Sequence, residues 1–336
     1  MPIVNQQNEQ EKAAYQSFVE QATYTAITQD PQWAHVKDNW ESLEVYLEED
    51  QKIVAAMSIL MIEQTEGQVF AYVSKGPAVN EQSPQIVDRL IAEAEATLRE
   101  KNVFLLRMDP EWTYSEEVSE AFREAGYHVR NRNVSGKATI QPRYTMRVDL
   151  RAFSSDEELM ASFYGKTRYR IRYALKNGLT YRLSDNRDDL AIFYDLHKKT
   201  SERHGISYRP FSYFERLADA FLERGLMRIV IVEVDGKPDA AGLDFAYGNY
   251  VWYMYAGSTH ENQVLMAPYL VNWVGMQWAL ALGKEFYDLG GVFAPDNSDS
   301  LYQFKYMFTR PNGATEYIGE IDKVFNEEYY QTFLNK

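Results

Sequence analysis

The sequence carries the same order of predicted elements twice, and this internal repeat strongly limits the folds that the chain can adopt. Residues 43–62 and 227–247 each read as a strand, a polar turn and a second strand. The second pair has Asp-Gly at 235–236, a dipeptide typical of a two-residue hairpin turn. An aromatic strand follows in each half and ends near a glycine, Gly76 in the first and Gly257 in the second.

A helix opened by proline comes next in both halves. The first follows Ser83, whose hydroxyl can cap it, and has Pro84 in its first turn, while the second begins at Ala267 and has Pro268 there. Apolar residues of the first helix recur at helical spacing, and these are Ile86, Val87, Leu90, Ile91, Ala94 and Leu98.

Each half is then predicted to finish with a strand that ends in an aspartate, Asp109 or Asp288. The repeat therefore predicts one β-β-β-α-β unit used twice, each copy preceded by helical sequence, with a boundary near residue 146. We expect an α+β chain of two tandem domains that share an interface. This element order resembles the GNAT-type N-acyltransferase fold, in which the acyl donor binds where strands separate in the middle of the sheet.

Composition limits the partners of the chain. The net charge of −14 repels nucleic acid and anionic membranes at long range, so an anionic partner must meet a local basic patch. The absence of cysteine excludes disulfides, thiol catalysis and thiolate metal sites. The polar N-terminus does not look like a signal peptide, and the longest apolar run, 53–62, is about half of the ~20 residues that a membrane helix needs. We expect a cytoplasmic protein that is monomeric, binds no DNA and does not insert into membranes.

Common catalytic motifs are missing. The sequence has no HExxH, GxxxxGK[ST], GxGxxG or GxSxG motif, and its five histidines show no metal-ligand spacing. Acyltransferases that bind acyl-CoA use a [QR]xxGx[GA] loop before a helix. The nearest stretches, 133–138 and 310–315, each fail at one end of that pattern. We expect no cofactor and no metal, and a CoA-dependent N-acetyltransferase stays as an alternative.

A basic stretch stands out in the second half. Residues 161–182 contain no acidic residue and six cations: Lys166, Arg168, Arg170, Arg172, Lys176 and Arg182. Neighbouring acids could neutralise a solvated helix face of this kind. We favour a phosphate-binding stripe for RNA, because Arg168, Arg172 and Lys176 recur every four residues on one helix face.

Two further stretches mix cations with aromatic rings. Residues 203–214 suit a binding surface for a ligand that has both an anionic group and a planar group. They also suit a loop in which Arg209 pairs with a carboxylate. In 301–310, Lys305 lies among aromatic residues. Its ammonium could reach water while its stem is buried, or it could be held in a cleft against a phosphate or an oxyanion.

Taken together, eight segments resemble the FemABX family of non-ribosomal peptidyltransferases over essentially the whole chain. They are TQDPQWAHVKDNW (28–40), YVSKGP (72–77), LLRMDP (105–110), ERHGISYRPFSYF (202–214), WYMYAGS (252–258), YDLGGV (287–292), SLYQFKYMF (300–308) and EYIGEIDKV (316–324). The chain lacks the long charged heptad stretch of the coiled-coil arm that larger members carry. The resemblance implies two acyltransferase-like domains, 1–145 with 317–336 and 146–316.

The resemblance also implies the reaction. Such an enzyme transfers an aminoacyl group from aminoacyl-tRNA to the side-chain amine of the third stem-peptide residue of a peptidoglycan precursor. For the compact type without the arm, we expect L-alanine, or else serine or glycine, to be added to the lysine of UDP-MurNAc-pentapeptide. The first domain would bind this acceptor, and the basic helix of the second, with Lys166, Arg168, Arg172 and Lys176, would face the tRNA.

Matching motifs carry over the roles of individual residues. Lys37 and Arg209 would clamp the UDP diphosphate, and Tyr213, Tyr255 and the hydroxyl of Ser207 would complete that site. The resemblance leads us to expect a threonine at this position. Ser207 stands there instead, and it keeps the hydroxyl group.

For the chemistry, we expect Lys305 to stabilise charge on the tRNA end or on the oxyanion. Asp109 is the first candidate for the general base, followed by Glu320 and Tyr253. Orientation alone could also be enough, with the substrate or the tRNA accepting the proton. A non-catalytic module that binds a nucleotide-sugar peptide or RNA is the alternative from another class.

Overall fold

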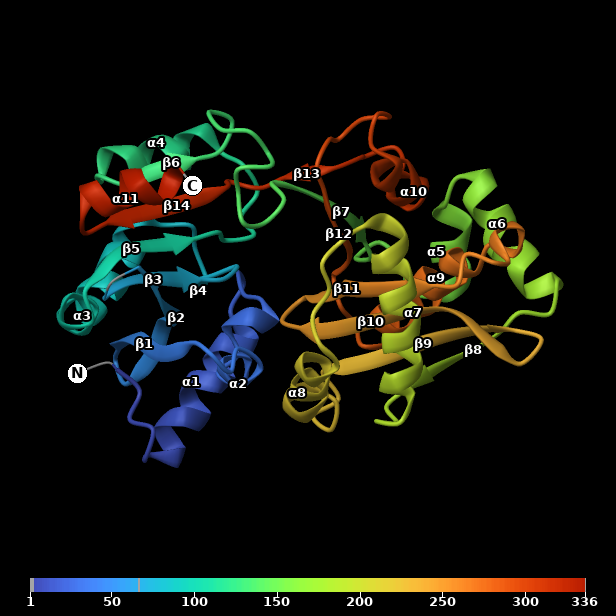
Figure 1. Cartoon of the computed structure of the whole chain (residues 1–336), viewed down its shortest axis with the longest axis horizontal. Coiled ribbons are helices and arrows are strands. Elements are labelled where there is room, and N and C mark those ends of the chain that lie inside the picture. The colour runs from blue at the N-terminus through green and yellow to red at the C-terminus, as the bar shows by residue number, and fades with distance from the viewer. Residues whose placement is uncertain (1–2, 66, 336) are drawn as a thin grey trace. The chain divides into compact units, whose positions relative to one another are not determined.

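The computed structural model describes residues 3–65 and 67–335, which form two mixed α/β units with one sheet each (Figure 1). The first unit comprises the chain up to Arg143 together with the chain from Glu316 onward. The second unit comprises Tyr144–Thr315.

The first unit is built around a sheet of order β1-β2-β3-β5-β14-β6, with β4 paired to β2. Only β3 and β5 pair in parallel among its described strands. Its elements are α1 (Glu9–Gln21), η1 (Ile27–Gln29), α2 (Trp33–Val36), β1 (Glu41–Glu49), β2 (Lys52–Thr65), β3 (Gln68–Val73), β4 (Ala78–Val79), α3 (Pro84–Glu100), β5 (Val103–Met108), α4 (Glu116–Glu124), β6 (His128–Arg130), β14 (Glu320–Val324) and α11 (Glu327–Leu334).

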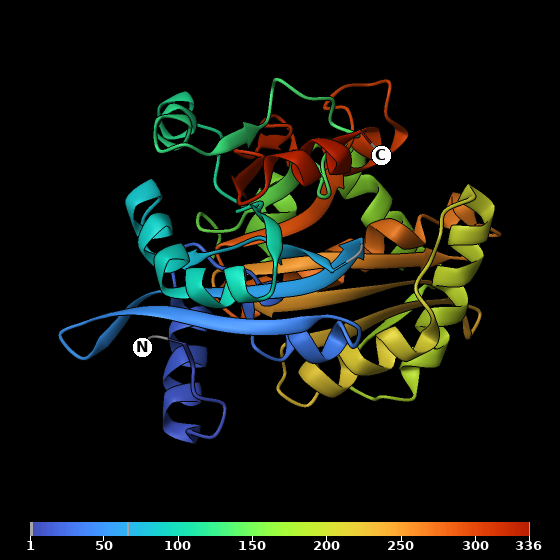
Figure 2. The ribbon, with the colours of Figure 1, turned by 60° about the vertical axis from the view of Figure 1, so that its left-hand side comes forward.

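Local sequence explains the hairpin and the helix of this unit. Asp50 and Gln51 join β1 to β2 with φ of 49° and 62°, the backbone that a tight hairpin turn requires. The hydroxyl of Ser83 accepts a hydrogen bond from the amide of Ile86 and caps α3 as predicted. Both α1 and α3 lie against the β1–β2 hairpin (Figure 2).

The C-terminal segment completes the first sheet, because β14 lies between β5 and β6. A buried bidentate ion pair holds it there. Nε and Nη2 of Arg107 each lie 2.7 Å from an oxygen of Asp322, and both side chains are almost fully buried. Paired and hydrogen-bonded in this way, the two charges can be buried together.

The second unit has a sheet of order β13-β7-β12-β11-β10-β9-β8, in which β11 and β12 are parallel. In Figure 1, α7 lies in front of this sheet and α9 behind it. The elements are β7 (Tyr144–Asp149), α5 (Asp156–Ser162), α6 (Gly165–Lys176), β8 (Thr180–Ser184), α7 (Asp189–His204), α8 (Phe211–Phe221), β9 (Met227–Val234), β10 (Lys237–Tyr247), β11 (Tyr250–Ser258), η2 (Gln263–Leu265), α9 (Ala267–Ala281), β12 (Phe286–Val292), α10 (Ser300–Thr309) and β13 (Thr315–Glu316).

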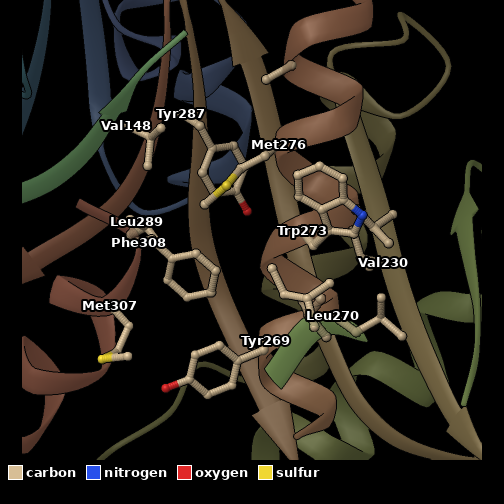
Figure 3. Close-up of a cluster of buried hydrophobic side chains, with 14 of the residues drawn as sticks. Val148, Val230, Tyr269, Leu270, Trp273, Met276, Tyr287, Leu289, Met307 and Phe308 are labelled. Atoms are coloured by element: carbon tan, nitrogen blue, oxygen red, sulfur yellow. The ribbon is translucent and has the colours of Figure 1, made fainter. Parts of the chain in front are cut away.

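The core of the second unit lies between the sheet and α9. Figure 3 shows Leu270, Trp273 and Met276 of this helix beside Tyr287 of β12. No charged residue interrupts the helix, as expected for an element that is buried nearly all round. The predicted strand–turn–strand at 227–247 is confirmed, with its turn at Asp235 and Gly236.

One strand boundary was predicted wrongly. Asp288 does not end its strand, because β12 continues to Val292. Gly290 has φ of +86°, and the pairing of β12 with β7 shifts between Asp288 and Gly291. A bulge therefore lets the strand continue past the aspartate, at a position where a side chain would strain the backbone.

Candidate active site

The two parallel strands of the second unit, β11 and β12, pair over a short stretch and then separate. Strands β11 and β12 share three residue pairs, and the last pair joins Trp252 to Asp288. One oxygen of Asp288 accepts hydrogen bonds from the amide of Gly290 at 2.6 Å and from the hydroxyl of Thr145 at 2.5 Å. These bonds fix the bulge that directs β12 away from its neighbour.

The ammonium of Lys305, on α10, lies close to this separation. Its Nζ donates to the main-chain oxygen of Gly291 at 2.9 Å. A Cβ atom built on Gly290 would lie 3.4 Å from that Nζ and 3.6 Å from the carbonyl oxygen of Tyr253. Lys305 is only 6% exposed, so the alternative that its ammonium reaches freely into water is wrong.

Lys305 loses its proton at a lower pH than an ordinary lysine does. Burial lowers its pKa to about 8, and the carboxylates of Asp288 and Asp299 limit that decrease. Asp299 also caps α10 through a 2.8 Å bond to the amide of Leu301. A desolvated ammonium of this kind interacts strongly with a nearby anion.

A second bulge sends two tyrosines of β11 to opposite faces of the sheet. Between β10 and β11 the register shifts, so that Leu243 faces Tyr255 whereas Asp244 faces Tyr253. Tyr253 lies on the side of α9, where its ring would touch a Cβ on Gly242. Without the extra residue, both tyrosines would point to the same side.

On the side of α7, Tyr255 meets α8, which follows the loop that joins these two helices. Its hydroxyl lies 3.0 Å from the hydroxyl of Tyr213, and the guanidinium of Arg209 lies 5.4 Å from the Tyr213 ring centre. Ser207 is exposed in the same loop. The second unit thus brings together Arg209, Tyr213 and Tyr255.

Arg209 is available to an anion. Its side chain is exposed, and no carboxylate of the described residues lies within ion-pair distance of it. The alternative in which Arg209 pairs with a nearby carboxylate is therefore wrong. An arginine placed on a tyrosine keeps its planar donor fork oriented and ready for a phosphate.

In the first unit, Asp109 follows β5 and is 7% exposed. It accepts hydrogen bonds from the hydroxyl of Tyr72 and, at 2.6 Å, from the amide of Lys75. Burial raises the pKa of Asp109 to about 7, and both hydrogen bonds work against the increase. A carboxyl of this kind can exchange a proton near neutral pH.

Glu320 and Tyr253 are less suited to proton transfer. Oε2 of Glu320 lies 2.9 Å from Nε of Arg130 and 3.2 Å from Nη1 of Arg107, and Oε1 accepts from the amide of Ile140 at 2.6 Å. With two cations bound and 1% exposure, Glu320 anchors a loop. Burial raises the pKa of Tyr253 above its usual value, which keeps the phenol neutral.

Lys37 lies at the end of α2 and is half-buried. Its amide donates to the carbonyls of Trp33 and Ala34, which closes the short helix. Sequence reasoning missed Tyr72 and Lys75, although both belong to YVSKGP and the parallel pairing of β3 with β5 brings them to Asp109.

The basic helix α6 keeps several cations unpaired. Lys166, Arg172 and Lys176 are exposed, and no carboxylate of the described chain lies within 4 Å of them in an ion pair. Arg168 instead donates to the carbonyls of Ala161 and Phe163 and so closes α5. The alternative in which neighbouring acids neutralise this face is wrong for the three exposed cations.

Neither stretch that resembles a CoA-binding loop precedes a helix. Residues 133–138 lie in the loop before β7, and 310–315 lead into β13. Within the described residues, no helix is long and apolar enough to cross a membrane, and no cluster of three or more potential ligand side chains could hold a metal.

Both units thus have the fold of an acyltransferase. A tandem GNAT protein from the clavulanic acid biosynthesis pathway superimposes with a TM-score of 0.54 at 9% identity, covering 94% of this chain and 96% of the other. A crystal structure of FemX gives a TM-score of 0.86 at 21% identity, covering 96% and 98%. No described helix exceeds the 17 residues of α3, so the predicted tandem fold without a coiled-coil arm is confirmed.

The chain belongs to the FemAB family, whose model matches residues 10–238 and 233–334. It is 40% identical over 334 residues to the UDP-N-acetylmuramoylpentapeptide-lysine N(6)-alanyltransferase of Weissella viridescens, covering 98% of each chain. It is 25% identical to the lipid II:glycine glycyltransferase of Staphylococcus epidermidis, covering 98% of this chain and 94% of that one. The predicted family is confirmed.

Proposed function

We propose that this chain transfers L-alanine from alanyl-tRNA to the ε-amine of the stem-peptide lysine in UDP-MurNAc-pentapeptide. The observation that carries the proposal is the 40% identity, across 98% of both chains, to an alanyltransferase with that acceptor. The buried Lys305 ammonium beside separating parallel strands supports it, because acyl transfer develops negative charge on the carbonyl oxygen.

In the proposed reaction, the lysine amine attacks the carbonyl carbon of the aminoacyl ester. A C–N bond forms and the C–O bond to the terminal ribose breaks. The amine loses a proton, and the departing ribose oxygen gains one to become a hydroxyl group. Lys305 stabilises the oxyanion or the departing ribose oxygen. Asp109, with a pKa of about 7, is our candidate for accepting the proton.

The acceptor is held, in this proposal, by cations and hydroxyls. Arg209 on Tyr213 binds the diphosphate together with Lys37, and Ser207 and Tyr255 add hydroxyl groups. The unpaired cations of α6 bind the tRNA backbone. We place the reaction in the cytoplasm, where both a UDP-linked precursor and aminoacyl-tRNA are available.

Mass spectrometry tests this function directly. UDP-MurNAc-pentapeptide with lysine at position three is incubated with the protein and tRNA charged separately with alanine, serine or glycine. We expect a mass gain of one alanine residue. A mass gain with acetyl-CoA as the donor would support the N-acetyltransferase alternative. A mass gain only on a lipid-linked acceptor would mean that the substrate lies at the membrane surface. Binding of the precursor without any gain would support a non-catalytic module.

A further inference from the structure

Four planar groups form a column between α6 and α10 in the second unit. The guanidinium of Arg310 lies 4.7 Å from the ring centre of Tyr164 and 4.6 Å from that of Tyr306. Tyr306 stacks on Tyr302 with centres 5.3 Å apart and planes 12° apart. Tyr302 is 9% exposed and Tyr164 is 44% exposed, so the column is anchored inside the unit and ends at its surface.

Arg310 contributes an unneutralised charge to this column. It is exposed, and no carboxylate of residues 3–65 and 67–335 pairs with it. Its two tyrosine neighbours hold the guanidinium plane by cation–π contacts, which leaves the charge open to an anion. The column therefore offers a flat surface and a positive charge at the same place.

The column also adjoins the exposed cations of α6. Tyr164 directly precedes this helix, and Lys166, Arg172 and Lys176 follow within it. The buried side of α6 is fixed by Thr167, whose hydroxyl donates to the carbonyl of Met307 at 2.5 Å. At about 1.5 Å per residue, these cations span roughly 15 Å along the helix, several phosphate spacings of a nucleic acid strand.

This combination of groups favours one kind of ligand. Phosphates alone would need only the cations, whereas an exposed tyrosine backed by arginine also suits the face of a nucleobase. Bases inside a duplex are already stacked on one another, so the column fits a base that is unpaired. A lipid headgroup has no planar part that would use Tyr164.

We propose that Tyr164, backed by Arg310, stacks on an unpaired nucleobase of the tRNA donor, while the cations of α6 hold the adjacent phosphates. This inference rests on the proposed function, because that function supplies the RNA. Tyr164 and Arg310 make the contact with the single-stranded part of the donor, and Lys166, Arg172 and Lys176 contact its backbone.

Two labelled RNA hairpins test the inference by fluorescence anisotropy with the full-length protein. One carries a single-stranded 3′ end like that of tRNA, and the other has the same stem with a blunt end. We expect Tyr164→Ala to weaken binding of the overhang hairpin about ten-fold and to leave the blunt hairpin unchanged. Tyr164→Phe keeps the ring and should bind normally.

Matched variants separate stacking from charge. Lys166→Gln, Arg172→Gln and Lys176→Gln combined should weaken both hairpins and flatten the salt dependence of binding. Arg310→Ala combined with Tyr164→Ala should lose less than the sum of the single losses, because the two groups form one surface. Arg187→Ala, which removes an exposed arginine paired with Asp219, is the control for lost charge and should change neither hairpin.

Several results would overturn the inference. Equal loss for both hairpins, or no loss, in Tyr164→Ala would exclude a stacking role while the tRNA-dependent transfer could still be observed. Tyr164-dependent binding to phosphatidylglycerol vesicles, with no preference for the overhang, would assign the surface to a membrane. Failure to bind either hairpin, together with no transfer from charged tRNA, would overturn the proposed function as well.

Discussion

The Nζ atom of Lys305 lies 2.9 Å from the main-chain oxygen of Gly291, and this hydrogen bond holds a lysine that is 6% exposed. The bond joins α10 to the bulged strand β12, close to the point where β12 leaves β11. Burying an ammonium is costly for the folded chain, even with the carboxylates of Asp288 and Asp299 nearby. Its retention is explained if an anion reaches the same place during the reaction.

Lys305→Met should therefore make the protein more stable but less active. Burial lowers the pKa of Lys305 from 10.5 to about 8, so the folded state binds its proton less tightly than the unfolded state. This cost, on the order of 3 kcal/mol, is complete below pH 8 and disappears as the pH rises toward 10.5. We expect a higher Tm at pH 7, a smaller gain at pH 9.5, and kcat lower by about 100-fold or more.

Lys284→Met is the matched control for that variant. Lys284 also donates to a main-chain oxygen, that of Gly248 at 2.6 Å, but its side chain is only half-buried. Its removal should not raise the Tm and should leave kcat unchanged. A lower Tm in Lys305→Met at pH 7 would contradict the view that the buried charge is costly, and an unchanged kcat would contradict its role in transfer.

The pH dependence of kcat/KM should be bell-shaped. Asp109 must be ionised to accept a proton, so the rate rises through its pKa of about 7. Lys305 must be protonated to stabilise negative charge, so the rate falls through its pKa of about 8. Initial rates measured from about pH 5.5 to about pH 9.5 would show both limbs of the profile. Asp109→Asn should lower the rate and remove the acid limb.

Tyr72→Phe gives an independent check on Asp109. The Tyr72 hydroxyl donates to Asp109 and lowers the pKa of that carboxyl. Its loss should therefore move the acid limb of the pH profile to higher pH. An acid limb that stays in place in both Tyr72→Phe and Asp109→Asn would mean that another group accepts the proton.

Arg209→Met should weaken binding of UDP-MurNAc-pentapeptide. The variant removes a charge that has no carboxylate partner among the described residues and that lies over the Tyr213 ring. Losing a charge-assisted bond to diphosphate should raise the Kd about 10- to 100-fold in calorimetry. Arg187→Met, at an arginine paired with Asp219, should bind normally. Equal affinity of the two variants would remove Arg209 from the acceptor site.

Local signals were sufficient for the helices and hairpins. Ser83 before a proline and an apolar stripe predicted α3 correctly, and Asp235-Gly236 marked a turn. These features depend on residues close in the chain. The place where a strand bends is different, because the bulge at Gly290 depends on pairing with β7, a strand more than 130 residues away.

The site was predictable only in part for the same reason. Arg209 and Tyr213 stand close together in the sequence, and they also lie close together in the structure, because they belong to one loop and the helix after it. The partners of Glu320 could not be read from the sequence, because Arg130 lies 190 residues away and the β14 strand lies between β5 and β6. The ion pairs of that carboxylate therefore depend on the order of strands that are far apart in the sequence.

Gly257→Ala should destabilise the second unit. A Cβ atom at this position of β11 would lie 2.3 Å from the main-chain nitrogen of His197 and 2.4 Å from the carbonyl carbon of Leu196, both on α7. Backbone atoms cannot move aside as a flexible side chain can, so α7 must shift away from the sheet. We expect a loss of about 1–3 kcal/mol in the free energy of unfolding, measured with urea. Gly165→Ala is the control, since the nearest atom to its Cβ is Nη2 of Arg168 at 3.9 Å and alanine favours the helix. Equal stability of the two variants would show that α7 does not pack on β11 at Gly257.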